Sequence, residues 1–152
     1  PRVLAWGECG LDYYRDRSPR DVQRAVFREQ IGYARRLALP LVLHIRQAEE
    51  DALRILDEEQ AWTGRVLVHC FTHDWPFARE VLERGGYLSA PGVATYKGAR
   101  EMQEALVHVP NEVLLLETDG PFLAPVPHRG SRNEPAFLVH TAKDSDQPSG
   151  CE

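Results

Sequence analysis

The sequence predicts an α/β protein built around a parallel sheet. Short apolar runs alternate with longer amphipathic segments along most of the 152 residues. Runs without a polar side are typical of strands buried on both faces, as in parallel sheets. The strands are predicted at residues 3–6, 41–45, 65–70, 87–89 and 113–118. Strict alternation of strand and helix implies right-handed crossover connections between neighbouring parallel strands.

The helices are predicted from apolar spacing and from start and stop signals. The first is expected to have Ser18 as its N-cap, Pro19 at its first position and Asp21 in its first turn, and it must end before Pro40. Its buried face is predicted to comprise Val22, Val26, Tyr33, Leu37 and their neighbours. Further helices are predicted at residues 48–59, 76–84 and 99–107.

The spacing of these elements favours a barrel over an open sheet. Five strands in 152 residues give about 30 residues per βα unit, as in a (β/α)8 TIM-type barrel of roughly 250 residues. The alternative is an open doubly wound sheet. Residues 1–142 are therefore predicted to form a partial barrel of about five βα units. Residues 143–152 lose the periodicity and become polar, so we expect a disordered tail.

Composition and charge indicate a cytoplasmic protein. The longest apolar run is far shorter than the roughly 20 residues that cross a bilayer, and no signal-peptide layout is present, so no membrane association is expected. Three cysteines without C-x-x-C spacing argue against a disulfide framework or a structural zinc site. The net charge is -5, so the chain lacks the excess of basic residues that is typical of nucleic-acid-binding domains. Bound divalent cations can still attract phosphates.

Potential metal ligands lie near the ends of four predicted strands. Glu8 follows the first strand, His44 lies in the second, His69 in the third, and Glu117 and Asp119 close the fifth. The intervals correspond to one, one and two βα units, so these side chains should meet at the carboxyl edge of the sheet. Two imidazoles with two carboxylates suit zinc, manganese, iron or magnesium. Hydrolysis by a metal-activated water is the predicted reaction class.

Each of these residues also has a structural interpretation. Glu8 could cap a turn, the two histidines could be ordinary core or rim residues, and Asp119 could cap the turn before Pro121. We favour Asp119 as the ligand and Glu117 as its support. Because successive side chains of a strand face opposite sides, Cys9 and Cys70 are expected to be buried, unreactive thiols.

Five segments together resemble the TatD family of metal-dependent deoxyribonucleases, in the amidohydrolase-like barrel superfamily. They are GECGLDYY at 7–14, PLVLHIR at 40–46, HCFT at 69–72, ETDGPFL at 117–123 and RGSRNEP at 129–135. Any one motif is weak, but together they follow the family's order and spacing from about residue 3 to 142. The family begins with a strand carrying a His-x-His pair, whereas no histidine precedes His44 here. The resemblance therefore implies the last five βα units of the barrel, in an N-terminally truncated form.

The resemblance also implies an activity and a ligand set. The expected reaction is cleavage of phosphodiester bonds in DNA, commonly as a 3′-5′ exonuclease, with two divalent ions (Mg, Mn or Zn) per intact enzyme. Glu8 would bridge the two ions, His44 and His69 would hold the second, and Asp119 would hold the first and orient or deprotonate the attacking water. Glu8 and Asp119 are thus the expected catalytic residues. The alternatives are a metal hydrolase of another ester, a lactone or an amide, and an inactive truncated fragment.

Contacts with a DNA substrate are expected from two loops at the same edge. Arg129 and Asn133 follow the fifth strand, and Tyr13 and Arg15 follow Glu8. Arginine forks bind phosphates and aromatic rings stack on bases. The structural alternatives are turn formation for the first pair and packing against the first helix for the second. DNA is the one partner expected, and no obligate protein partner is inferred.

Overall fold

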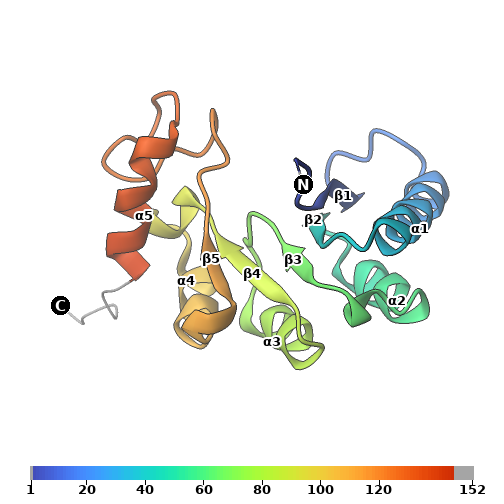
Figure 1. Cartoon of the computed structure of the whole chain (residues 1–152). Coiled ribbons are helices and arrows are strands. Elements are labelled where there is room, and N and C mark those ends of the chain that lie inside the picture. The colour runs from blue at the N-terminus through green and yellow to red at the C-terminus, as the bar shows by residue number, and fades with distance from the viewer. Residues whose placement is uncertain (1, 146–152) are drawn as a thin grey trace. The chain divides into compact units, whose positions relative to one another are not determined.

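The computed structural model describes residues 2–145, and the chain divides into two compact units (Figure 1). Unit 1 comprises Pro1–His69 and Val81–Tyr87, and unit 2 comprises Cys70–Glu80 and Leu88–Glu152. The helix α3 (Trp75–Glu83) crosses the division between them. No helix among the described residues is both long and apolar enough to cross a membrane.

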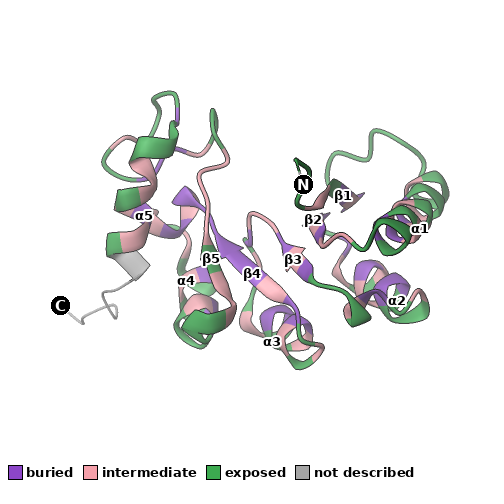
Figure 2. Ribbon diagram, in the orientation of Figure 1, coloured by how far each residue is buried: buried purple, intermediate pink, exposed green. Residues whose placement is uncertain are grey.

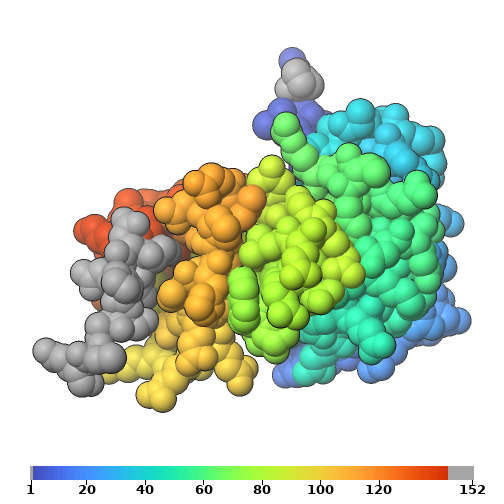
Figure 3. All heavy atoms as spheres, turned by 90° about the horizontal axis from the view of Figure 1, so that it is seen from below, coloured from blue at the N-terminus to red at the C-terminus, as the bar shows by residue number. Residues whose placement is uncertain are grey.

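Among the described residues, unit 1 contains three parallel strands, two complete helices and the end of α3. Strand β1 (Trp6–Asp12) pairs with β2 (Leu41–Arg46), which pairs with β3 (Val66–Val68). The connections between these strands contain α1 (Arg20–Leu37), α2 (Glu49–Glu58) and the 3-10 turn η1 (Ala61–Thr63). Helix α2 is buried along one side and exposed along the other (Figure 2). In the space-filling view, the cyan to green atoms of this unit form a continuous surface on the face that is drawn (Figure 3).

Helix α1 buries a different stripe from the predicted one. Its buried residues are Phe27, Ile31 and Ala34, whereas four residues of the predicted face are 45–55% exposed: Val22, Val26, Tyr33 and Leu37. Both sets recur at helical spacing, so periodicity alone cannot decide which one packs on the sheet. The predicted cap was also wrong, because Pro19 is the N-cap and no side chain caps the helix. The Ser18 carbonyl oxygen instead accepts a hydrogen bond from the Gln23 side chain.

Unit 2 is built on the parallel pair of β4 (Tyr87–Ala90) and β5 (Leu114–Leu116). Its helices are α4 (Arg100–Val107) and α5 (Leu138–Ser145), and the 3-10 turns are η2 (Gly92–Thr95), η3 (Asn111–Val113) and η4 (Pro135–Phe137). Helix α5 contacts η2 and β5. Because α5 continues through Ser145, it overlaps the predicted tail, and residues 146–152 lie outside the described part.

The predicted strands are found close to their expected positions, with one correction. The first strand runs over Trp6–Asp12 instead of residues 3–6, so Glu8 lies inside it. The apolar pattern is interrupted at Gly7, Glu8 and Gly10, so the sequence alone did not predict a strand there. Pairing with β2 makes this segment extended. A Cβ on Gly10 would clash with the His44 carbonyl oxygen, so glycine permits the close approach of β1 to β2 at this point.

Candidate metal centre

Three of the four predicted ligands come together within unit 1. Oε1 of Glu8 lies 3.0 Å from Nε2 of His69, and Oε2 of Glu8 lies 3.7 Å from Nδ1 of His44. The side chains of Glu8, His44 and His69 are 50%, 35% and 16% exposed. The carboxylate therefore lies between two imidazoles in a setting that solvent can reach.

Parallel pairing positions these side chains. Gly10 of β1 is opposite His44 of β2, and Leu43 is opposite Val68 at the end of β3. The N–H of His69 donates to the Leu43 carbonyl oxygen at 2.9 Å, which holds His69 directly after β3. Glu8, His44 and His69 thus reach the same part of the unit from three adjacent segments of the sheet.

Asp12 is a further carboxylate of this cluster that sequence reasoning missed. Its Oδ2 lies 3.2 Å from Nε2 of His44, and its Oδ1 accepts the N–H of Arg15 at 2.8 Å. Burial opposes the charged form of Asp12, but the hydrogen bonds from Arg15 and His44 and the nearby charges hold its pKa below the ordinary value. The sequence could have indicated Asp12, because it lies four residues after Glu8 and residues four apart in a strand share a face.

The donor set fits a divalent metal ion. Glu8 offers carboxylate oxygens, and His44 and His69 offer imidazole nitrogens on either side of it. Three protein ligands of this kind are typical of hydrolytic sites that keep a coordination position open for water. The partial exposure of Glu8 and His44 agrees with an open position of this kind.

Unit 2 contains the other two carboxylates that the sequence indicated. The carboxylate of Glu117 accepts hydrogen bonds from the N–H of Cys70, at 3.0 Å, and from the hydroxyl of Ser89. These contacts agree with a supporting role for Glu117. Asp119 follows β5 with a φ of 44°, and its carbonyl oxygen accepts the N–H of Phe122 at 2.9 Å. Asp119 therefore begins a tight turn, and its role as a ligand stays a prediction.

The two described cysteines differ in their surroundings. Cys9 is 5% exposed, and burial, with the nearby charge of Glu8, raises the pKa of its thiol to about 12. Cys70 is only half-buried. The expectation that Cys70 is buried was wrong. Strand β3 ends at Val68 and Cys70 has a φ of 47°, so the alternation of side chains along the strand does not extend to it.

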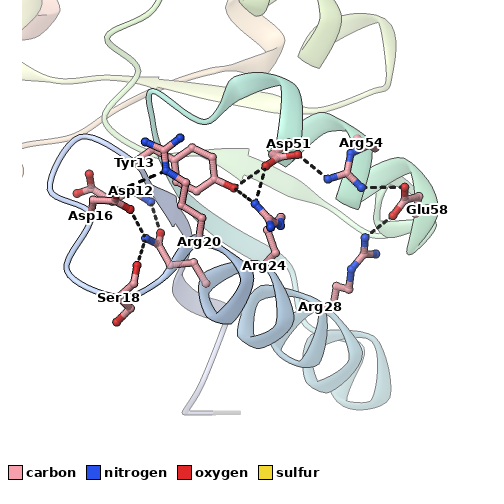
Figure 4. Close-up of polar contacts among 11 residues, drawn as sticks. Asp12, Tyr13, Asp16, Ser18, Arg20, Arg24, Arg28, Asp51, Arg54 and Glu58 are labelled. Carbon is pink, nitrogen blue, oxygen red and sulfur yellow. Dashed lines mark hydrogen bonds and ion pairs between the residues drawn. The ribbon is translucent and has the colours of Figure 1, made fainter.

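The contacts of Tyr13 favour packing over substrate binding. Its hydroxyl donates to Oδ2 of Asp51 at 2.6 Å and lies 3.2 Å from an Arg24 nitrogen that donates to it. The guanidinium of Arg20 lies over its ring at 4.4 Å, so both the ring and the hydroxyl are engaged (Figure 4). Arg15, in contrast, is 55% exposed, with Nε 3.9 Å from Oδ2 of Asp12.

The loop after β5 is held by Asn133, which is 3% exposed. Its side-chain amide donates to the carbonyl oxygens of Thr118 and Phe122, and its Oδ1 accepts the N–H of Glu134 at 2.9 Å. These bonds agree with the turn-forming alternative for Asn133. Arg129 is exposed, with its guanidinium over the Tyr96 ring at 4.5 Å.

Comparison with known proteins identifies the family. Residues 1–147 match the family described as TatD related DNase. The chain belongs to the TatD family. This TatD chain is 46% identical over 142 residues to YabD of Bacillus subtilis, an uncharacterized metal-dependent hydrolase, a match covering 93% of the chain and 56% of YabD. It is 42% identical over 145 residues to the 3′-5′ ssDNA/RNA exonuclease TatD of Cronobacter turicensis, covering 92% of the chain and 55% of that protein.

The fold of the TatD chain also matches a solved structure. YjjV, a TatD homologue of Escherichia coli K12, superposes with a TM-score of 0.88 at 27% identity, covering 96% of the chain and 57% of YjjV. The predicted family and the predicted partial barrel are therefore confirmed. The chain spans about half the length of the curated relatives it matches.

Proposed function

We propose that this TatD-family chain supplies part of the active site of a metal-dependent hydrolase that cleaves phosphodiester bonds in DNA. The position of the Glu8 carboxylate carries the proposal. Its two oxygens lie 3.0 Å from His69 Nε2 and 3.7 Å from His44 Nδ1. A carboxylate flanked by two imidazoles would hold divalent ions such as Mg, Mn or Zn.

Each predicted ligand has a distinct task in this proposal. Divalent ions bound here would polarise a phosphoryl oxygen and make a coordinated water a better nucleophile. Glu8 would hold the ions because one of its oxygens lies beside His69 and the other lies beside His44. His44 and His69 present ring nitrogens from β2 and from the residue after β3. Asp119 orients the attacking water or accepts its proton.

A nucleic-acid substrate is supported by one relative and by two exposed guanidinium groups. The Cronobacter turicensis relative is named for 3′-5′ exonuclease activity on ssDNA and RNA. Arg15 and Arg129 are exposed and could contact phosphates despite the net charge of -5, because bound cations would offset that charge locally. We therefore propose exonucleolytic attack from the 3′ end of DNA.

A hydrolase of a different ester, a lactone or an amide is the second candidate. The name of YabD specifies a metal-dependent hydrolase and no substrate. The same donor set can polarise a carbonyl oxygen as well as a phosphoryl oxygen, so the ligands do not select between these reactions.

The test compares substrates, chelation and ligand variants. The chain is assayed on a labelled single-stranded DNA oligonucleotide and on p-nitrophenyl esters, with Mg²⁺ or Mn²⁺ and again after EDTA. We expect release of nucleotides from the 3′ end that EDTA abolishes. Glu8→Ala and His69→Ala should each lower the rate at least about 100-fold, whereas the control His108→Ala removes an imidazole that packs on Trp75 and should leave the rate unchanged.

The possible results separate the candidates. Turnover that persists in both ligand variants would contradict the proposed site. Cleavage of the esters alone would favour the second candidate. Absence of turnover on every substrate, together with weak metal binding, would support an inactive fragment.

A further inference from the structure

We propose that Asp12 is a positioning residue for His44: it accepts the Nε2–H of the imidazole and so leaves the Nδ1 lone pair directed toward Glu8 and a metal ion. This inference rests on the proposed metal site. Asp12 lies at the end of β1, four residues after Glu8, and neither its position in the motif nor the comparisons assign it a role.

The geometry assigns one carboxylate to each nitrogen of the His44 ring. Nε2 lies 3.2 Å from Oδ2 of Asp12, within hydrogen-bond distance, whereas Nδ1 lies 3.7 Å from Oε2 of Glu8. A neutral imidazole carries a single N–H, and an ionised carboxylate can only accept. The shorter contact places the hydrogen on Nε2, since Nδ1 is too far from Glu8 for a comparable hydrogen bond.

Asp12 is itself held in place by the backbone around it. Its second oxygen, Oδ1, accepts the N–H of Arg15 at 2.8 Å, so the two oxygens serve two different donors. The N–H of Asp12 donates to Oε1 of Gln23 at 3.0 Å. The N–H of Tyr13 donates to the Arg46 carbonyl oxygen at 2.9 Å, which ties the end of β1 to the end of β2.

The side chain of Gln23 connects Asp12, at the end of β1, to the loop before α1. Its amide nitrogen donates to the Ser18 carbonyl oxygen at 2.9 Å and to Oδ1 of Asp16 at 3.3 Å. Asp12 is therefore fixed by its backbone and by one of its own oxygens, and the remaining oxygen is directed to His44. A pre-fixed acceptor of this kind can select one tautomer and one ring orientation.

This arrangement has a chemical consequence for metal binding. Histidine ligands usually donate the second ring N–H to a carboxylate or carbonyl, which orients the ring and makes the ligating nitrogen more basic. Loss of such a partner typically lowers metal affinity about 10- to 100-fold. Asp12 would supply this partner to His44, and the ring nitrogen on the Glu8 side would then be the one that holds an ion.

The experiment reads the tautomer of His44 directly, in metal-free, ¹⁵N-labelled protein at a pH where the imidazole is neutral. Long-range ¹H–¹⁵N spectra distinguish a protonated from an unprotonated ring nitrogen, and the His44 signals are assigned as those lost in His44→Gln. We expect the proton on Nε2. In Asp12→Asn a single oxygen remains and the Arg15 N–H holds it, so the amide NH₂ faces Nε2 and should move the proton to Nδ1.

Zn²⁺ and Mn²⁺ titrations by calorimetry give a second readout. Asp12→Asn and Asp12→Ala should weaken binding about 10- to 100-fold. Asp21→Asn is the matched control, because Asp21 is an exposed aspartate in the first turn of α1 and has no contact with Asp12 or His44 among those described. It should change neither the tautomer nor the affinity.

The outcomes distinguish this inference from the proposed function. A proton on Nδ1 in the wild-type chain, or a tautomer unchanged by Asp12→Asn, would overturn the role of Asp12. If Asp12→Asn fails to fold, the wild-type spectrum alone decides. If the wild-type tautomer is as expected but neither metal binds, Asp12 still positions His44 while the proposed metal site is rejected.

Discussion

Oε1 of Glu8 lies 3.0 Å from Nε2 of His69, although the two residues are 61 positions apart in the chain. Such a contact forms only when β1, β2 and the end of β3 are paired in register. The candidate metal centre therefore depends on the strand pairing of unit 1.

Metal binding should stabilise the folded chain through Glu8. A ligand at 100 times its Kd adds about 2.7 kcal/mol to the free energy of unfolding. We expect Zn²⁺ or Mn²⁺ to raise the Tm of the wild-type chain, and Glu8→Gln to abolish the rise because a neutral amide is a poor metal ligand. Differential scanning fluorimetry with and without metal measures this. His108→Gln is the control, and an undiminished rise in Glu8→Gln would contradict the assignment.

Stability at low pH should depend on Asp51. The hydrogen bonds from Tyr13 and Arg54, together with the positive charges of Arg54 and Arg24, lower the pKa of Asp51 from 3.8 to about 2. Because the folded-state value is lowered, its contribution is fully present above pH 3.8 and is lost as the pH falls toward 2. The unfolding free energy, measured by urea titration, should fall less steeply with decreasing pH in Asp51→Asn than in the wild-type chain over this range.

Two further variants test whether the pH dependence arises from the contact between Tyr13 and Asp51. Tyr13→Phe removes the hydroxyl donor and should weaken the pH dependence, with a loss of about 1 kcal/mol at neutral pH. Asp21→Asn, at an exposed position in the first turn of α1, should keep the wild-type pH profile. If Tyr13→Phe kept full stability but lost DNA binding, the substrate role of Tyr13 would be favoured instead.

Gly10 should tolerate no side chain. A Cβ there would clash with the His44 carbonyl oxygen, and the φ of 134° is unfavourable for other residues. We expect Gly10→Ala to lower the unfolding free energy by at least about 2 kcal/mol and to weaken metal binding, because β1 must shift away from β2. Gly98→Ala, where a Cβ meets nothing within 4 Å, is the matched control.

Asn133 should contribute mainly to the stability of the fold rather than to substrate binding. Its three hydrogen bonds hold the carbonyl oxygens of Thr118 and Phe122 and the N–H of Glu134 in a buried site. Asn133→Ala should cost about 2–3 kcal/mol of unfolding free energy in urea titrations, since buried groups lose their partners. Arg132→Ala, at the exposed neighbouring position, should cost less than about 0.5 kcal/mol.

Cys9 should resist thiol reagents in the folded chain. Its burial and its pKa of about 12 leave almost no thiolate at pH 8. The double variant Cys70→Ser, Cys151→Ser retains Cys9 as its single thiol. We expect no reaction with DTNB at pH 8 until guanidinium chloride unfolds the chain, when one equivalent should react. Rapid reaction of the native variant would show that Cys9 is accessible.

Much of the fold followed from local patterns in the sequence. Short apolar runs with helical segments between them placed strands near β2, β3, β4 and β5, because burial on both faces requires continuous apolar side chains. The positions of Glu8, His44 and His69 near strand ends indicated a shared edge, since parallel strands end at the same side of a sheet. These inferences needed only residue spacing.

The tertiary structure decided the features that depend on partners distant in the chain. Sequence periodicity could not select between the two apolar stripes of α1, because the choice of Phe27 over Val26 depends on how the helix packs on the sheet. Asp12 acquired a role only when β1 paired with β2 and brought it to His44, 32 residues away. The hydroxyl of Tyr13, in the turn after β1, was likewise engaged by Asp51 of α2, 38 residues away. Local pattern identifies residues suited to chemistry, whereas long-range packing determines which of their atoms meet.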